Sequence, residues 1–117
     1  MRSLILASLV AALPISASAA PDGKAIFAAR CAGCHSLTAK SGPAGPQLKG
    51  VVGRKIAGAP DFSYSPGLKA KAGTWTAANL DAYLSAPATF APGTKMFARL
   101  ADAAERAAVI TYLKTVK

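Results

Sequence analysis

The sequence predicts an all-α domain in which short helices are joined by long loops, and three observations support this. No run alternates apolar and polar residues for long enough to require a strand. Capping residues stand before apolar segments that repeat at helical spacing. Gly and Pro are frequent between Ser41 and Gly67, which indicates a loop. We therefore expect about four helices.

The two terminal helices have the clearest signals. Asp22 is a suitable N-cap for the first helix, which carries Ile26 and Phe27 on one face. Asp102 can cap the last helix, with Glu105 three residues later in a capping-box pattern. Both apolar faces need burial, so we expect the two helices to share a core. The face of the last helix consists of Val109, Ile110, Leu113 and Val116.

Two further helices are expected between them. Thr74 can cap a helix that bears Leu80 and Tyr83. This helix should stop before Pro87, because the residue preceding a proline avoids helical geometry. A shorter helical turn is expected from Pro66 to Lys71.

The first residues have the order of a secretory signal peptide. Arg2 is followed by an apolar stretch of 12 residues from Leu4 to Ile15, broken only by Ser8 and Pro14, and then by small residues. The stretch is shorter than the roughly 20 residues that span a bilayer. We expect residues 1–19 to be a signal peptide cleaved near Ala19, leaving no stable membrane span, and residues 20–117 to form one small domain.

The net charge of the chain indicates which kinds of binding partner it favours. The chain has 14 Lys and Arg residues against five Asp and Glu, and a formal net charge of +9. All but Arg2 of these charges lie in residues 20–117. The basic residues are scattered and are not clustered with aromatic ones, so we expect no nucleic-acid binding. A basic surface favours acidic protein partners.

The chemistry is concentrated in five residues, Cys31-Ala32-Gly33-Cys34-His35. This is the C-x-x-C-H signature of covalent haem c attachment. Two thiols at this spacing reach the vinyl groups on one edge of a porphyrin, while the adjacent imidazole reaches the iron. Cys31 and Cys34 are therefore expected to bind one haem c per chain, with His35 as an iron ligand.

Three other interpretations of the motif are weaker. A disulfide would be ordinary in an exported protein, but it leaves His35 without a role. A thioredoxin-type dithiol normally follows the first strand of a βαβ unit, and no such pattern precedes Cys31. A structural zinc site needs four ligands, and the chain has only two Cys and one His.

Met96 is the candidate for the second iron ligand. It is the only methionine after Met1, and the chain has no second histidine. Such a residue more often only fills a core. Met96, however, ends the segment Pro92-Gly93-Thr94-Lys95-Met96, whose Pro and Gly favour a fixed turn. Ligation by His and Met raises the reduction potential, as an electron carrier requires.

These motifs resemble class I cytochrome c, of the bacterial periplasmic type, over nearly all of residues 20–117. In that family about four helices and long loops wrap around one covalently attached haem. The segment from Pro92 to Met96 is identical to the family's distal-ligand loop. Gly45-Pro46-Gln47-Leu48 resembles the segment in which a proline carbonyl accepts a hydrogen bond from the proximal histidine, which implies that role for Pro46.

The resemblance implies further haem contacts. Arg54, Tyr64 and Trp75 match positions that bond or screen the haem propionates. Tyr83 and Thr94 match residues beside the distal methionine, where a hydroxyl can hold the sulfur. Taken singly, each of these could be an ordinary core or surface residue, but their order and spacing favour the family roles.

The resemblance extends to the crossing of the two terminal helices, and the sequence departs from the family pattern at two places. Gly23, Phe27 and Tyr112 sit where the family crosses its terminal helices at a glycine and packs an aromatic pair. Leu68 stands where many relatives have asparagine in the haem crevice. Phe97 follows Met96 directly, so the chain is one residue shorter before its last helix than the eukaryotic pattern.

The expected function is that of a soluble, monomeric, periplasmic electron carrier rather than an enzyme, passing one electron between respiratory or other redox partners. Arg30 and Lys95 flank the two ligand segments and are candidates for the docking rim. The alternatives are a peroxidase or gas-binding cytochrome with a labile distal ligand, and the haem subunit of a dehydrogenase complex.

Overall fold

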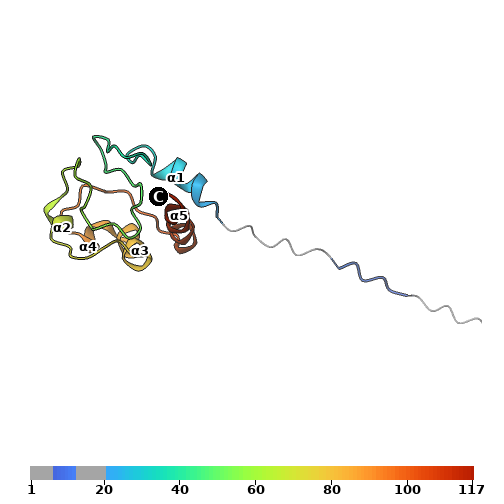
Figure 1. Cartoon of the computed structure of the whole chain (residues 1–117). Coiled ribbons are helices and arrows are strands. Elements are labelled where there is room, and N and C mark those ends of the chain that lie inside the picture. The colour runs from blue at the N-terminus through green and yellow to red at the C-terminus, as the bar shows by residue number, and fades with distance from the viewer. Residues whose placement is uncertain (1–6, 13–20) are drawn as a thin grey trace, which may run out of the picture.

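A computed structural model describes residues 7–12 and 21–117, and within them the fold is helical (Figure 1). Most of the predicted signal peptide, including the cleavage site after Ala19, lies outside the described residues. No helix in the described part of the chain is long and apolar enough to cross a membrane. The helices are α1 (Gly23–Arg30), α2 (Pro66–Lys69), α3 (Ala77–Ser85), α4 (Pro87–Phe90) and α5 (Ala103–Thr115).

The predicted caps of the terminal helices are confirmed. The Asp22 carboxylate accepts a hydrogen bond from the Lys24 amide at 3.1 Å. The Asp102 carboxylate accepts from the amides of Ala104 and Glu105, at 2.8 and 3.1 Å. Each cap satisfies amides that have no partner within the helix.

Helices α1 and α5 cross closely, as the resemblance implied (Figure 1). A Cβ built on Gly23 would lie 2.1 Å from the Ala108 carbonyl oxygen, so only glycine fits at this crossing. Beside it, the rings of Phe27 and Tyr112 pack with centroids 5.8 Å apart. Helix α3 packs against both α5 and α4. The terminal helices thus form one wall of the domain.

The start of α3 differs from the prediction. Its N-cap is Thr76, whose hydroxyl accepts from the Asn79 amide at 3.2 Å while the Asn79 side chain accepts from the Thr76 amide at 2.6 Å. Thr74 instead forms an isolated antiparallel bridge with Lys55 and accepts a hydrogen bond from the Asn79 side chain at its carbonyl. The reciprocal bonds of a capping box outweigh the single bond that Thr74 could offer.

Two other differences concern helix number and length. Helix α3 ends at Ser85, before Pro87 as predicted, but Pro87 then begins the additional short helix α4. Proline is favoured at the first helical position because its fixed φ suits the helix and its missing N–H has no partner there. The predicted turn from Pro66 forms as α2, which ends at Lys69.

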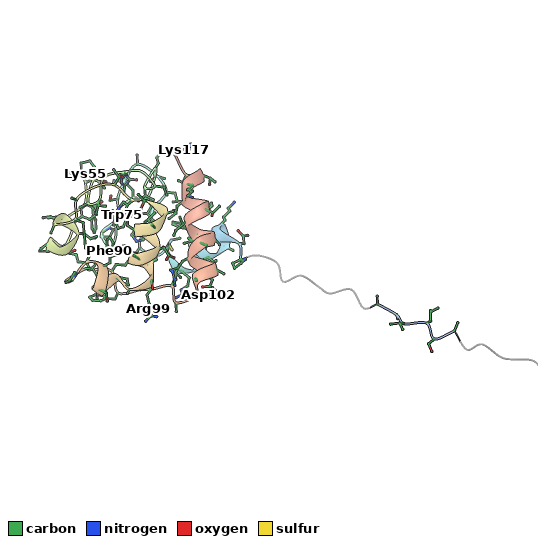
Figure 2. All side chains as sticks on the ribbon, turned by 90° about the horizontal axis from the view of Figure 1, so that it is seen from below. Lys55, Trp75, Phe90, Arg99, Asp102 and Lys117 are labelled. Atoms are coloured by element: carbon green, nitrogen blue, oxygen red, sulfur yellow. The ribbon has the colours of Figure 1, made fainter. Side chains whose placement is uncertain are left out.

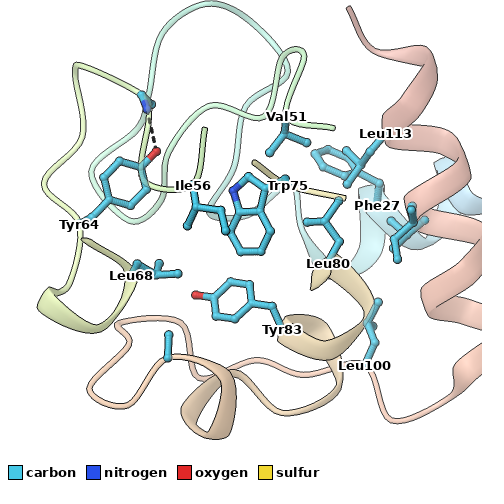
Figure 3. Packing of buried hydrophobic residues seen from close by; sticks show 14 residues of the cluster. Phe27, Val51, Ile56, Tyr64, Leu68, Trp75, Leu80, Tyr83, Leu100 and Leu113 are labelled. Atoms are coloured by element: carbon cyan, nitrogen blue, oxygen red, sulfur yellow. Dashed lines mark hydrogen bonds between the residues drawn. The ribbon is translucent and has the colours of Figure 1, made fainter. Parts of the chain in front are cut away.

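The buried core lies between the helices and the loops, with Trp75 at its centre (Figure 3). The Trp75 ring is 5.3 Å from the Tyr83 ring and 5.8 Å from the Phe90 ring, measured between centroids. Figure 2 shows Trp75 and Phe90 inside the domain and the charged Lys55, Arg99 and Lys117 at different edges of it. The core is therefore aromatic, and the basic charge is spread around it.

Candidate functional site

A cavity of about 310 Å³ with a mainly apolar lining opens into this core. Its volume is at the lower end of the range of about 300–1,000 Å³ that small-molecule sites occupy. The walls come from the end of α1, the loop segments around residues 44–54 and 62–68, helices α3 and α5, and residues 94–100. The structure brings all ten residues proposed from the sequence to this lining: Cys31, Cys34, His35, Pro46, Arg54, Tyr64, Trp75, Tyr83, Thr94 and Met96.

The attachment motif forms the turn that ends α1. The amides of Cys31 and Ala32 both donate to the Phe27 carbonyl at 2.9 Å, and the His35 amide donates to the Cys31 carbonyl at 3.0 Å. Cys31 is half-buried, Cys34 is exposed, and the two thiols are free. Burial raises the pKa of the Cys31 thiol above its ordinary value, and the positive charge of Arg30 opposes this shift. Both sulfurs therefore lie on one edge of the cavity as unpaired thiols.

The imidazole of His35 is oriented by a backbone carbonyl. Its Nδ1 lies 2.8 Å from the Pro46 carbonyl oxygen. A carbonyl only accepts, so Nδ1 carries the proton and donates, which leaves Nε2 with a free lone pair. Hydrogen bonds of this kind fix the ring orientation of metal-ligating histidines. The arrangement leaves Nε2 available to bind a metal ion.

Gly45 has a steric role that sequence reasoning did not find. A Cβ at this position would lie 2.8 Å from the Cys34 carbonyl oxygen and 2.8 Å from Cε1 of His35. The backbone before Pro46 can therefore approach the imidazole only as glycine. The Gly-Pro pair was visible in the sequence, but a steric limit of this kind depends on the folded loop.

Met96 lines the cavity from the segment that follows Gly93. The Thr94 hydroxyl, which is buried, lies 2.7 Å from the Tyr83 hydroxyl and accepts from the Met96 amide at 3.3 Å. Gly93 provides the turn with a left-handed φ of 81°. Burial raises the pKa of the Tyr83 phenol, and its hydrogen bond with Thr94 opposes this in part, so the phenol stays protonated near neutral pH.

The loop that carries Met96 is also held by contacts with residues 62–67. The Lys95 ammonium donates to the Ser63 carbonyl at 2.9 Å and lies 6.0 Å from the centre of the Phe62 ring. A Cβ on Gly67 would lie 2.2 Å from the Pro92 carbonyl oxygen, so α2 packs closely against the loop. Lys95 is exposed, but its bond to the Ser63 carbonyl connects the Met96 loop to residues 62 and 63.

Arg54 provides a cationic corner. Its guanidinium donates to the carbonyls of Gln47 and Lys49 at 2.8 and 3.3 Å. Its Nε is buried and has no hydrogen-bond partner among the described residues, although Arg54 lines the cavity. A buried donor of this kind calls for an acceptor, and a carboxylate would satisfy it. Nearby, the Tyr64 hydroxyl accepts from the Ala59 amide at 3.1 Å, which leaves its proton free to be donated (Figure 3).

Together these groups fit a haem. Two thiols and an imidazole stand on one side, a thioether lies on another segment, the remaining walls are apolar, and a cationic corner suits the propionates. Leu68, the departure from the family pattern, is buried and lines the cavity. Phe97, the other departure, is 89% exposed at the mouth. Neither departure blocks the donor set.

Comparisons with known proteins agree with this fit. The family model for cytochrome c matches residues 20–117. Cytochrome c type-1 of Ascaris suum is 44% identical over 94 residues, which are 80% of this chain and 84% of that protein. Cytochrome c2 iso-1 of Magnetospirillum molischianum is 45% identical over 91 residues, covering 75% of this chain and 91% of that protein.

Two further relatives are bacterial. The c-type cytochrome cy of Rhodobacter capsulatus is 44% identical over 98 residues, 83% of this chain, but the match spans only 49% of that longer protein. The solved structure of cytochrome cH from Methylobacterium extorquens aligns with a TM-score of 0.73 at 42% identity, covering 80% of this chain and 94% of that one. These relatives are electron carriers with covalently bound haem c rather than enzymes. The chain therefore belongs to the cytochrome c family, as a class I electron-transfer protein that carries haem c on its C-x-x-C-H motif.

Proposed function

We propose that residues 20–117 carry one electron at a time between redox proteins of the periplasm, and that His35, through Nε2, and Met96, through its sulfur, would hold the haem iron. The observation that carries this proposal is that the two side chains line one cavity from different chain segments. The His35 imidazole is oriented by the Pro46 carbonyl, and the backbone of Met96 is held by the bond from its amide to the Thr94 hydroxyl.

Bound haem supplies a one-electron ferric/ferrous couple. The protein's part would be to hold the iron through His35 and Met96, to exclude water and to balance charge. The buried side chains of Leu68, Leu80 and Leu100 keep the cavity apolar. The Arg54 guanidinium would offset the negative charge of a propionate, and the Tyr83 phenol bonds the Thr94 hydroxyl, which accepts from the Met96 amide. Because two side chains would hold the iron within a mainly apolar lining, electron transfer is the chemistry that this arrangement supports.

The docking surface that we propose surrounds the exposed Phe97. Arg30 donates to the Arg99 carbonyl at 3.2 Å, which places these two basic residues side by side, and Lys95 lies on the same rim of the cavity. Such a rim suits a protein partner with an acidic patch around an apolar centre. The monomeric state and export through the signal peptide at 1–19, cleaved near Ala19, complete the proposal.

The function is tested by a redox titration of the purified holoprotein together with carbon monoxide binding. We expect one electron per haem, a positive potential, and no rapid binding of carbon monoxide to the ferrous protein at neutral pH. Rapid binding would instead favour the gas-binding or peroxidase alternative. Amino-terminal sequencing of the periplasmic protein tests the leader, and we expect the chain to begin at Ala20.

The docking rim has its own test, the ionic-strength dependence of electron transfer to an acidic redox protein. Arg99→Gln should lower the association rate and flatten its salt dependence. Lys117→Gln removes the same charge at a distant edge of the domain and is the matched control (Figure 2). Equal effects of the two substitutions would rule out this rim as the docking site.

A further inference from the structure

The segment that follows Met96 has few attachments of its own. Residues 97–102, here called the return segment, lead from Met96 to α5 without regular structure. Phe97, Ala98 and Arg99 are exposed, and no hydrogen bond among the described residues holds Phe97 or Ala98. Backbone contact resumes at Leu100, whose amide donates to the Leu84 carbonyl at 2.9 Å.

One side chain fastens this segment to two helices. Arg106 of α5 donates from Nη1 to the carbonyls of Leu100 and Ala101, at 2.9 and 3.0 Å. Its Nε donates to the carboxylate of Asp81 on α3 at 2.7 Å, and this is the only ion pair in the described part of the chain. The Arg106 side chain is 12% exposed and the Asp81 side chain 48%, so the guanidinium is largely shielded from water while the carboxylate is open to it.

The carbonyl of Leu100, which Arg106 binds, belongs to a residue that lines the cavity together with Met96. Leu100 is 4% exposed and lines the cavity, four residues after Met96. Between them the one other side-chain hydrogen bond, from Arg30 to the Arg99 carbonyl, is exposed and longer, at 3.2 Å. Without the Arg106 bonds, two carbonyls of the return segment would lose their partners and could turn to water. Among the described residues, the hydrogen bonds left to residues 97–101 would be the Leu100 amide on the Leu84 carbonyl and the exposed Arg30 bond to the Arg99 carbonyl.

We propose that Arg106 is a positioning residue that holds the return segment against α3 and thereby keeps Met96 on the iron. This inference rests on the proposed function, because it takes Met96 as the distal ligand. The Asp81 carboxylate neutralises the guanidinium in the wild type, and the lysine variant, which keeps the positive charge, distinguishes an effect of position from one of charge. Arg106 is not itself among the residues that line the cavity, and its contact with the lining is the bond to the Leu100 carbonyl.

The test is a titration of the ferric holoprotein with imidazole, which binds the iron only when Met96 leaves. In Arg106→Gln we expect the imidazole dissociation constant to fall roughly tenfold, the scale of losing one hydrogen bond to a charged group. Arg106→Lys retains the charge and one possible carbonyl contact, so it should fall between wild type and the glutamine variant. The weak ferric absorption band of methionine ligation should persist in all three proteins without imidazole.

A matched control separates positioning from general loss of stability. Phe27→Leu weakens the packing between α1 and α5 but leaves the return segment and the cavity lining intact. The free energy of unfolding is measured for each variant, and only the arginine variants should bind imidazole more tightly than their stability loss explains. An unchanged imidazole constant in Arg106→Gln, or a change no larger than that of Phe27→Leu at equal stability loss, would overturn the inference.

Two further outcomes are decisive. If Arg106→Gln does not fold, Arg106→Lys and Asp81→Asn take its place, and unchanged imidazole binding in both would refute the positioning role. If wild type itself lacks the methionine-ligation band, the proposed function fails at Met96, before Arg106 is tested.

Discussion

Substituting Gly23 by alanine should destabilise the protein, although alanine is the better helix former. The new Cβ would lie 2.1 Å from the Ala108 carbonyl oxygen, 2.7 Å from its carbonyl carbon and 2.9 Å from Cβ of Tyr112. Two of these atoms belong to the α5 backbone and cannot rotate away. The helices must therefore separate, which loosens the packing of Phe27 on Tyr112.

The size of the effect follows from two opposing contributions. Overpacking costs about 1–3 kcal/mol, and a rigid backbone contact belongs at the upper end of that range. Alanine returns less than the roughly 0.5–1 kcal/mol of helix propensity that it gains in the middle of a helix, because Gly23 is the first residue of α1. The net loss is about 2 kcal/mol, which for a domain of this size lowers the midpoint of thermal unfolding by about 10 °C.

Thermal and urea unfolding of the holoprotein, followed by circular dichroism, measures this loss. Gly42→Ala is the control, because its nearest neighbour is the Cys34 carbonyl oxygen at 3.9 Å. It should change the free energy of unfolding by no more than about 0.5 kcal/mol. If Gly23→Ala is as stable as wild type, the crossing is not limited by this contact and the reasoning is refuted.

Three other substitutions have defined outcomes. The Asp61 carboxylate accepts hydrogen bonds from the Ser41 hydroxyl and amide, at 2.6 and 2.7 Å, and these bonds lower its pKa. The stability advantage of wild type over Asp61→Asn should therefore be present near neutral pH and vanish as the pH falls through the folded-state pKa. Urea unfolding across pH measures this. Ala57 has a φ of 58°, so Ala57→Gly should stabilise by about 0.5–1 kcal/mol, and a loss in the same assay would contradict this. Arg54→Gln removes a positive charge beside the cavity and should lower the reduction potential in a spectroelectrochemical titration, where an unchanged value would argue against a propionate contact.

What could be predicted from the sequence was local or carried by motif spacing. The caps Asp22 and Asp102 act on amides two or three residues away, so their role follows from the adjacent sequence. Thr76 was missed in favour of Thr74 because both are good caps, and only the reciprocal bond with Asn79 distinguishes them. Helix α4 was missed because Pro87 was taken as a stop, whereas it also begins a new turn.

In the site, too, residues with a recognisable local pattern could be predicted and the others could not. Spacing and resemblance found residues that carry recognisable chemistry, including His35 and Met96. They did not find Gly45 or Arg106, because the first is required by a steric limit in a folded loop and the second by carbonyls that α5 reaches only after packing. Long-range steric and backbone contacts of this kind leave no pattern at a fixed sequence spacing.

The visible spectrum of the ferric holoprotein tests whether Met96 is the distal ligand of the haem iron. We predict the weak long-wavelength band of methionine-to-iron ligation in wild type and its loss in Met96→Ala, with the haem still covalently attached in both. A high-spin wild-type spectrum that lacks this band, or a band that survives in Met96→Ala, would contradict it.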